Sequence, residues 1–211
     1  MKWIMESAQK TETAELRKVG YHHGDLRAGL IEATRRLIEE HGPDGFSVSE
    51  ACRLAGVSTA APYKHFKDKQ EMLLAMVLEG MDRLRQNMHS ALENVEPGTP
   101  DRITVLGQEY VRFALTEPGL FRFKFGGFSD RLDDDRLQQA GQDTFSIVLR
   151  EVALCMGESE VTQEVRRRGF MLWNFVHGLS FILHDQRLAE QGGDIDLDHI
   201  LSDMSQRILR D

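Results

Sequence analysis

The segment from Phe46 to Lys69 constrains the fold of this chain more than any other, because it places helix-capping and turn residues at close intervals. Ser47 and Glu50 form an S-x-x-E capping box, which marks the start of a helix. Gly56 follows, and glycine readily takes the left-handed conformation that ends a helix in a tight turn. The spacing predicts a short helix that ends just before this glycine.

A second short helix is expected directly after the turn, beginning at Ser58 or Thr59 and ending near Phe66. Pro62 has no backbone N–H, which is tolerable only in the first turn of a helix, so it indicates where this helix starts. Two short helices joined by a tight turn form a helix-turn-helix, whose second helix can enter the major groove of DNA. The segment therefore indicates a DNA-binding regulator rather than an enzyme.

The side chains of this second helix suit two kinds of DNA contact. Short side chains at its start let the backbone approach the bases, and a threonine can contact a base edge. The aromatic and basic side chains that follow can bond phosphate oxygens, as can backbone N–H groups near Ser47 and Asp68. The predicted DNA-binding residues are Ser47, Ser58, Thr59, Ala60, Ala61, Tyr63, Lys64, His65 and Lys69. A core role for Tyr63 and an ordinary surface role for the lysines are the alternative, and Phe66 is assigned to the core.

The net charge of −8 argues against a nucleic-acid partner until its distribution is considered. Residues 17–69 hold nine Lys and Arg against seven Asp and Glu, a net charge of +2, whereas residues 70–211 carry −9. Attraction to phosphate is local, because exposed charges are screened within about 8 Å at physiological salt. An acidic body behind a mildly basic head is therefore compatible with DNA binding, although charge alone would not indicate it.

The composition, 41% hydrophobic and 28% charged over 211 residues, is that of a globular protein. The N-terminal residues lack the apolar core of a signal peptide, and no apolar run reaches the roughly 20 residues that span a bilayer. We therefore expect a cytoplasmic protein with no membrane partner. Cys52 and Cys155 fit a reduced compartment and show no zinc-site spacing. The sequence has no nucleophile elbow, P-loop or G-x-G-x-x-G motif, so neither catalytic residues nor a cofactor are predicted.

Nearly every segment has the apolar spacing of a helix, which predicts an all-α fold of about nine helices, with an N-terminal three-helix head and a C-terminal helical bundle. Besides the two short helices, we expect helices over 25–41, 68–92, 101–116, 118–126, 133–156, 160–187 and 196–210. Three domains are expected: an arm over 1–20, the helix-turn-helix head over 21–69, and an effector-binding and dimerisation domain over 70–211 that starts with the linker helix 68–92.

The pattern G-V-S-x-x-x-x-Y-x-H-F-x-x-K, which spans Gly56 to Lys69, resembles the signature of TetR-family transcriptional regulators. The segments Tyr21–Arg27, Glu117–Phe121 and Trp173–Gly178 resemble the branch of that family with a WHG-type C-terminal domain. The resemblance is strong over the head and scattered over the remainder. Three head positions depart from the family's usual residue without removing a DNA-facing group, namely Ala51, Cys52 and Pro62.

The resemblance implies an all-helical homodimer with its third helices in the major groove, a C-terminal effector pocket, and repression as the usual outcome. A palindromic operator requires two heads held roughly 34–36 Å apart, or a multiple of that spacing. The resemblance places the dimer face on the helices over 160–187 and 196–210, which could form a four-helix bundle with their counterparts. The predicted interface residues are Phe170, Phe181, His184, Ile200 and Met204. The alternative is that these apolar stripes belong to the core of one subunit.

Aromatic side chains concentrate between residues 110 and 128, and large rings in a helical bundle can leave a cavity for an apolar or aromatic effector. The predicted pocket residues are Tyr110, Phe113, Phe121, Phe125, Phe145, Trp173 and His177. The alternative is that the rings simply fill the core. No metal is expected at His177 and His184, because helical ligand pairs are usually three or four residues apart. A ligand-independent DNA occlusion protein of the same fold is the alternative function.

Overall fold

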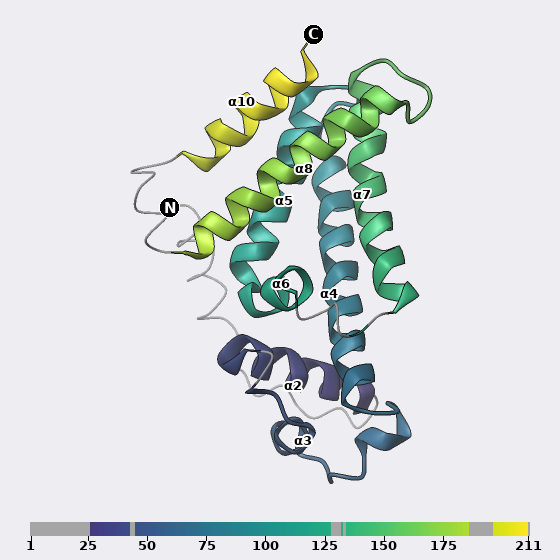
Figure 1. Cartoon of the computed structure of the whole chain (residues 1–211), viewed down its shortest axis with the longest axis vertical. Coiled ribbons are helices and arrows are strands. Elements are labelled where there is room, and N and C mark those ends of the chain that lie inside the picture. The colour runs from purple at the N-terminus through teal and green to yellow at the C-terminus, as the bar shows by residue number, and fades with distance from the viewer. Residues whose placement is uncertain (1–25, 43–44, 128–131, 133, 186–195, 211) are drawn as a thin grey trace.

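The computed structural model describes the chain except for residues 1–25, 43–44, 128–131, 133, 186–195 and 211 (Figure 1). Its elements are α2 (Leu26–His41), α3 (Val48–Ala55), the 3-10 helix η2 (Pro62–Lys64), α4 (Lys69–Leu92), α5 (Pro100–Thr116), α6 (Pro118–Phe125), α7 (Asp135–Cys155), α8 (Gln163–His184) and α10 (Leu197–Leu209). The described residues contain no strand, which confirms the all-α fold. The predicted arm over 1–20 lies outside the described residues.

Local sequence signals fix the ends of the two helices that flank the turn region. Ser47 caps α3, because its Oγ accepts a hydrogen bond from the Glu50 N–H at 3.2 Å. Gly56 ends α3 with φ 68° and ψ 31°, the left-handed conformation that its sequence position predicts. Asp68 caps α4, because its carboxylate accepts a hydrogen bond from the Glu71 N–H at 2.9 Å.

The prediction of a regular helix from Ser58 or Thr59 to Phe66 is wrong in its length and type. Successive i to i+3 turns replace it, with the Ala61 N–H donating to the Ser58 carbonyl at 3.0 Å, and only Pro62–Lys64 forms a 3-10 helix. In a helix capped at Ser58, the N–H of residue 62 would make the first intrahelical bond, to the Ser58 carbonyl, and Pro62 has no N–H to donate. The segment is too short to offset this loss, since a helix must first form a costly initial turn.

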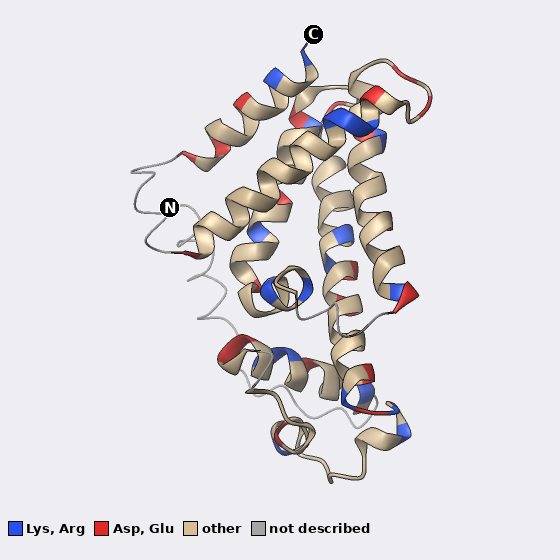
Figure 2. Cartoon of the chain, in the orientation of Figure 1, with Lys and Arg blue, Asp and Glu red and all other residues tan. Residues whose placement is uncertain are grey.

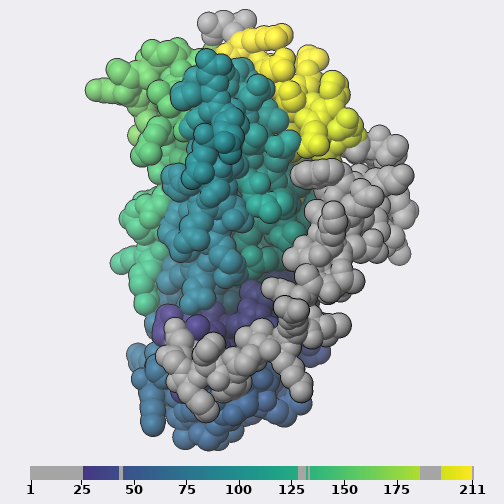
Figure 3. Space-filling view, turned by 180° about the vertical axis from the view of Figure 1, so that it is seen from behind, coloured from purple at the N-terminus to yellow at the C-terminus, as the bar shows by residue number. Residues whose placement is uncertain are grey.

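The molecule is elongated, with α2, α3 and η2 forming a head at one end and α5, α7, α8 and α10 forming a body at the other (Figure 1). The helix α4 starts in the head and runs through the body, and its 24 residues span about 36 Å at 1.5 Å per residue. From the reverse side, α4 and α5 fill the centre of the body and α10 forms one edge (Figure 3). The predicted linker helix 68–92 is thus present as a single continuous helix.

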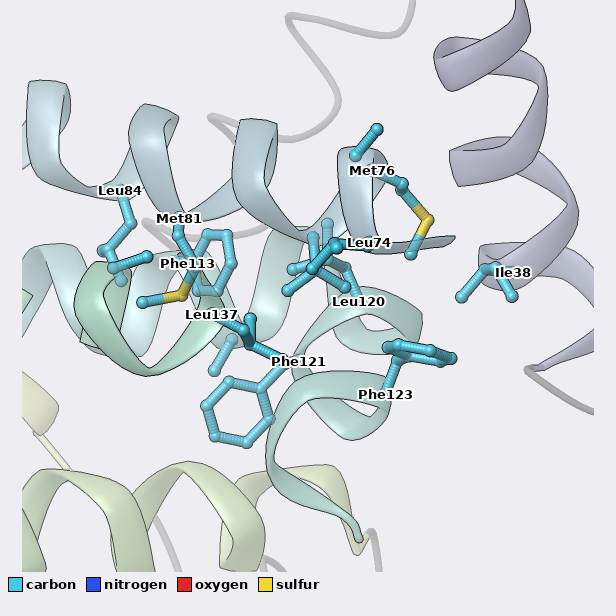
Figure 4. Packing of buried hydrophobic residues seen from close by; sticks show 14 of the residues in the cluster. Ile38, Leu74, Met76, Met81, Leu84, Phe113, Leu120, Phe121, Phe123 and Leu137 are labelled. Atoms are coloured by element: carbon cyan, nitrogen blue, oxygen red, sulfur yellow. The ribbon is translucent and has the colours of Figure 1, made fainter. Parts of the chain in front are cut away.

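The short helix α6 lies between the head and the body and buries side chains toward both (Figures 1 and 4). Leu120 points toward Leu74 of α4, and Phe123 points toward Ile38 of α2 (Figure 4). Phe121 points the other way, and its ring lies against Phe181 of α8 at a centroid distance of 5.2 Å. The ring of Tyr110 on α5 also lies 6.0 Å from that of Phe121, so the eight residues of α6 pack against α2, α4, α5 and α8.

A buried ion pair holds the far end of the body together. Arg102 of α5 donates from Nε and Nη2 to the two carboxylate oxygens of Glu151 on α7, at 2.6 and 3.2 Å. Its Nη1 also donates to the carbonyls of Leu92 and Val95, at 3.1 and 2.6 Å. The Arg102 and Glu151 side chains are only 13% and 6% exposed. This one guanidinium therefore joins α7 to the end of α4 and to the loop that follows it.

Candidate nucleic-acid interface and effector cavity

The turns around η2 form an outer face of the head, at the end of the molecule away from the body (Figure 1). Tyr63 is 63% exposed, which rules out the core role considered for it, whereas Phe66 is buried as expected. Pro62 is also buried and anchors the segment from below. Most of the residues predicted to contact DNA are exposed here, namely Ser58, Thr59, Ala60, Tyr63, Lys64, His65 and Lys69, while Ala61 and Ser47 are half-buried.

The ammonium group of Lys69 has a structural contact that the sequence does not reveal. Its Nζ donates to the Phe46 carbonyl at 2.6 Å and lies 5.1 Å from the centre of the Phe46 ring. This contact joins the start of α4 to Phe46, the residue before the N-cap of α3. An ammonium group has three N–H donors, so the Phe46 bond leaves donors for a phosphate oxygen. Lys69 therefore holds the two ends of the helix-turn-helix together, and its DNA contact stays a prediction.

Basic residues cluster between η2 and the start of α4 (Figure 2). Lys64, Lys67 and Lys69 fall within six positions, with Asp68 as the one acid among them. The Asp68 carboxylate accepts a hydrogen bond from the Glu71 N–H. Its negative charge therefore compensates the partial positive charge at the N-terminus of α4. The exposed edge of the head consequently combines an aromatic hydroxyl with several cations, the side chains that bond phosphate oxygens.

A cavity of about 140 Å³ lies inside the body, among α4, α5, α7, α8 and α10 and the end of α6. Its walls are almost entirely apolar. Four of the residues predicted for an effector pocket line it, namely Tyr110, Phe125, Phe145 and Trp173. Met204, which was predicted for the dimer interface, also lines the cavity. The methionines Met81 and Met88 and the cation Lys124 line it too and were not anticipated from the sequence.

The remaining three predicted pocket residues, Phe113, Phe121 and His177, do not line the cavity. Phe113 and Phe121 are buried in the core. A hydrogen bond of 2.7 Å joins the His177 Nδ1 to the Tyr110 hydroxyl. Its ring lies 4.9 Å from that of Phe125, so it supports two residues of the cavity wall from behind.

Burial affects the ionisable groups of this aromatic cluster. It raises the pKa of Tyr110 and lowers the pKa of His177. It also lowers the pKa of His184, and the nearby positive charge of Arg122 contributes to that shift. The His184 Nε2 is buried without a hydrogen-bond partner. The uncharged forms of these side chains are therefore favoured beside the cavity.

A stripe of exposed apolar side chains runs along α8 on the side away from the cavity. Phe170, which is 56% exposed, and Phe181 lie eleven residues apart, or about three helical turns, and so share one face. Met171 and Ile182 are exposed beside them. The inner edge of the Phe181 ring packs against Phe121, as the His184 ring does, at centroid distances of 5.2 and 5.4 Å. We refer to Phe170, Met171, Phe181 and Ile182 as the α8 stripe.

The N-terminus of α6 is held by a carboxylate from the head. Glu39 of α2 accepts the Gly119 N–H at 2.6 Å and the Leu120 N–H at 3.0 Å. A side chain at Gly119 would lie 2.7 Å from the Ile38 carbonyl oxygen and 2.8 Å from the Glu39 Cα, so only glycine allows this approach. An anion at a helix N-terminus is favourable because it compensates the unpaired N–H groups. The sequence contained the Pro118-Gly119 pair, but nothing local pointed to Glu39 as its partner.

The two cysteines are unsuited to act as nucleophiles. Cys52 is buried in the head. Burial raises the pKa of Cys155 to about 11, and its Sγ–H donates to the Thr99 carbonyl at 3.1 Å. The described residues contain no cluster of three metal-ligating side chains, and none of their helices is long and apolar enough to cross a membrane.

Comparison with known proteins agrees with this architecture. Residues 30–76 match the model of bacterial regulatory proteins of the tetR family, and residues 103–205 match that of a tetracyclin repressor-like C-terminal domain. The chain is 24% identical to the nucleoid occlusion factor SlmA of Vibrio vulnificus over 173 residues, which cover 82% of this chain and 80% of that protein.

Solved structures extend the similarity to the whole fold. A protein of unknown function from Rhodococcus sp. RHA1 is 29% identical with a TM-score of 0.74, covering 92% of this chain and 98% of that one. The regulator FadR from Bacillus subtilis, in complex with stearoyl-CoA, is 16% identical with a TM-score of 0.61, covering 86% and 97%. With its head and its body each matched by a family model, the chain belongs to the TetR family of DNA-binding transcriptional regulators.

Proposed function

We propose that this regulator is a repressor that binds a palindromic operator as a homodimer and is released when a small apolar effector occupies the body cavity. The observation that carries the proposal is the position of α6. Its C-terminal residues Lys124 and Phe125 line the cavity, and its N-terminal Gly119 is bonded to Glu39 of the head. A molecule that pushes on one end of this helix therefore acts on the head through the other.

The DNA contacts divide between phosphate and base recognition. Tyr63 and Lys64 are exposed at the edge of the head and suit phosphate oxygens, which set position without reading sequence. Thr59 and Ala60 are exposed on the turn that precedes η2, where short side chains allow a close approach to the bases. The absence of an α-helix over 58–66 changes the local shape of this surface but leaves these side chains facing outward.

Replacing Tyr63 with phenylalanine removes only its hydroxyl and should weaken binding on every DNA sequence. The slope of log affinity against log salt should flatten by about one unit if Lys64→Ala removes one phosphate contact. Thr59→Ala should instead alter base preference. We would measure this by fluorescence anisotropy at several salt concentrations, on an operator selected from a random DNA pool. Unchanged affinity and salt slope for Lys64→Ala would show that this lysine does not touch the backbone of DNA.

The α8 stripe suits a second copy of the chain, because an isologous two-fold contact needs a self-complementary apolar face. Its four side chains are large, and exposed apolar side chains on one helix face mark interaction sites. Two copies related by this contact would present two heads to a palindrome. Ile200 of α10 is half-buried and is a further candidate for this interface.

Phe170→Glu should separate the dimer, because it places an unpaired charge in an apolar contact. The expected cost is about 2 kcal/mol or more, the effect of losing a central interface anchor. Sedimentation velocity over a protein dilution series would measure the dimer constant, and operator affinity should fall in parallel. Leu154→Glu, at an exposed apolar position on α7, is the control that should leave the dimer intact. A Phe170→Glu protein that remains dimeric would exclude the α8 stripe as the interface.

Effector binding should weaken operator binding, and Glu39 should transmit this effect. A saturating neutral apolar probe, 3-phenylpropan-1-ol, should weaken operator binding by at least about fivefold, the lower end of typical coupling. Glu39→Gln removes the negative charge at the N-terminus of α6. The ratio of operator affinities without and with the probe should therefore move closer to one. Glu40→Gln, at the adjacent exposed carboxylate of α2, should leave the factor unchanged. Calorimetric titration of the probe into free and operator-bound protein measures it, and equal affinities would exclude the proposed release.

A ligand-independent occlusion protein is the second candidate, and one observation favours it. The similarity to the nucleoid occlusion factor SlmA covers 82% of this chain and so includes both the head and the body. Such a protein would bind a palindrome without any response to small molecules. The titration described above separates the two functions, because only an effector-responsive regulator couples the cavity to the operator.

A further inference from the structure

Gly141 lies inside α7 at a place where a side chain would fit. It is the seventh of the 21 residues of this helix. Glycine is less favourable than alanine there, because it loses more backbone freedom when the helix forms. Yet a Cβ on Gly141 would meet none of the described residues within 4 Å, apart from the adjoining backbone of its own helix. The fold therefore leaves room for a side chain at position 141 that the sequence does not fill.

Close packing explains another glycine of the cavity wall, Gly107 of α5, but not Gly141. A Cβ on Gly107 would lie 3.2 Å from the Leu201 Cδ2 and 3.4 Å from the Val176 Cγ1. Both distances are shorter than the roughly 3.5–4.0 Å at which carbon atoms attract most strongly. Gly107 therefore allows α5 to approach α8 and α10 closely, whereas no neighbouring helix approaches Gly141 in this way.

The missing side chain of Gly141 faces the cavity. Residues three, four and seven positions along an α-helix share a face with the first one. On α7 these residues are Thr144, Phe145 and Val148, and all three line the cavity together with Gly141. The two residues that directly follow Gly141 are exposed, on the opposite side of the helix. A side chain at position 141 would therefore project into the cavity.

The space beside Gly141 lies at the end of the cavity nearest the head. The helices α4 and α7 run away from the head, and α5 runs back toward it (Figure 1). The lining residues nearest the head are therefore Met81 on α4, Gly141 on α7 and Tyr110 on α5. Phe125 at the end of α6 also lines the cavity, and its ring lies 6.2 Å from that of Tyr110. Ligand atoms beside Gly141 are thus at the same end of the cavity as α6.

Shape rather than hydrogen bonding should decide which ligands fit, because the hydroxyl groups of the described wall residues are already bonded within the protein. Thr144 and Ser205 each donate to the carbonyl four residues earlier, both at 2.8 Å. The Tyr110 hydroxyl lies 2.7 Å from the His177 Nδ1. A cavity of roughly 150 Å³ lined by apolar side chains accommodates benzene, and this one is about 140 Å³. In so small a space, one additional carbon atom on the wall should change which ligands bind.

We propose that Gly141 sets the size limit of the effector, because the space left by its missing side chain holds the part of the ligand that lies nearest α6. This inference rests on the proposed effector function and adds the residue that determines which ligands fit. Alanine would suit the helix better but would occupy this space. The glycine therefore trades helix stability for room at the end of the cavity where a ligand can contact α6.

Two alcohols that differ only in length test the size limit. Isothermal titration calorimetry would compare benzyl alcohol with 3-phenylpropan-1-ol, which has two more methylene groups. The longer alcohol should bind the parent protein at least about tenfold more tightly, since each buried methylene contributes about fourfold. Gly141→Ala places one carbon in the space and should lower this ratio about fourfold, with little effect on benzyl alcohol. Gly141→Leu should weaken the binding of both alcohols at least about tenfold.

Thermal unfolding and a second glycine control for effects on folding. Gly141→Ala should raise the melting temperature by about 1–4 °C, because alanine stabilises a helix where it meets no obstacle. Gly29 of α2 is the matched control, since a Cβ there also meets no described residue within 4 Å, and Gly29 does not line the cavity. Gly29→Ala and Gly29→Leu should leave the affinities for both alcohols unchanged.

The outcomes separate this inference from the proposed function. If both alcohols bind and their ratio is the same in Gly141→Ala as in the parent protein, the size limit is wrong and the effector function stands. A ratio that falls equally in Gly29→Ala would also overturn the size limit. If the ratio falls only in Gly141→Ala, the size limit is supported, and the proposed release still fails if 3-phenylpropan-1-ol leaves operator affinity unchanged. If neither alcohol binds the parent protein, both proposals fail.

Discussion

Replacing Phe121 with alanine should lower the free energy of unfolding by about 3–5 kcal/mol, the usual cost of removing a fully buried ring. The side chain has no exposed surface. Its ring contacts Tyr110 on α5 and Phe181 on α8, at centroid distances of 6.0 and 5.2 Å. Urea unfolding followed by circular dichroism, at one fixed protein concentration, measures the loss.

Two comparisons make this result specific. Leu154→Ala removes an apolar side chain that is 46% exposed, and should change stability by only about 0.5 kcal/mol. Phe121→Leu keeps most of the buried volume and should cost clearly less than the alanine change. A Phe121→Ala protein as stable as Leu154→Ala would mean that α6 does not depend on this ring for its position between the head and the body.

Arg102→Ala should also destabilise the protein by about 3–5 kcal/mol, because it leaves the buried Glu151 carboxylate without its partner. It would also deprive the Leu92 and Val95 carbonyls of a donor. The ion pair is at the end of the body away from the head, so its loss should loosen α7 rather than the DNA-facing surface. Thermal and urea unfolding would measure the change, with operator affinity as a separate readout.

Arg112→Ala is the matched control for this change, since it removes an arginine from the same helix. Arg112 is half-exposed and pairs with Glu109 one turn earlier, an arrangement that contributes little to stability. The double change Arg102→Met with Glu151→Leu should recover a large part of the loss, because an apolar pair leaves no buried charge. If Arg102→Ala and Arg112→Ala prove equally mild, the buried pair is not what holds α7.

Local signals in the sequence were sufficient where neighbouring residues determine the conformation. Ser47, Gly56 and Asp68 occupy the cap and turn positions that their sequence context predicts. These features depend on residues only a few positions apart, so pattern reasoning reaches them. The predicted helix over 58–66 failed at Pro62, where one missing N–H outweighed the helical spacing around it.

Contacts between residues far apart in the chain could not be predicted from local sequence patterns. The aromatic content of residues 110–128 indicated a cavity region, but Phe121 fills core while Lys124 and Met81 line the wall. That choice depends on how α6 is rotated against α4 and α5. The bond from Glu39 to Gly119 joins residues 80 positions apart, and a carboxylate on an amphipathic helix gives no sign of such a partner.

The contact between Lys69 and Phe46 affects the shape of the head surface that is proposed to bind DNA. It closes a 23-residue segment that contains α3 and, after Gly56, a single 3-10 turn in place of a second α-helix. The part after Gly56 is anchored by the buried Pro62 and Phe66 and by the Lys69 ammonium group at its end. A surface built from turns can adjust to the width of the groove, which varies with DNA sequence. We therefore expect the choice of operator to depend on the deformability of the duplex as well as on contacts with base edges.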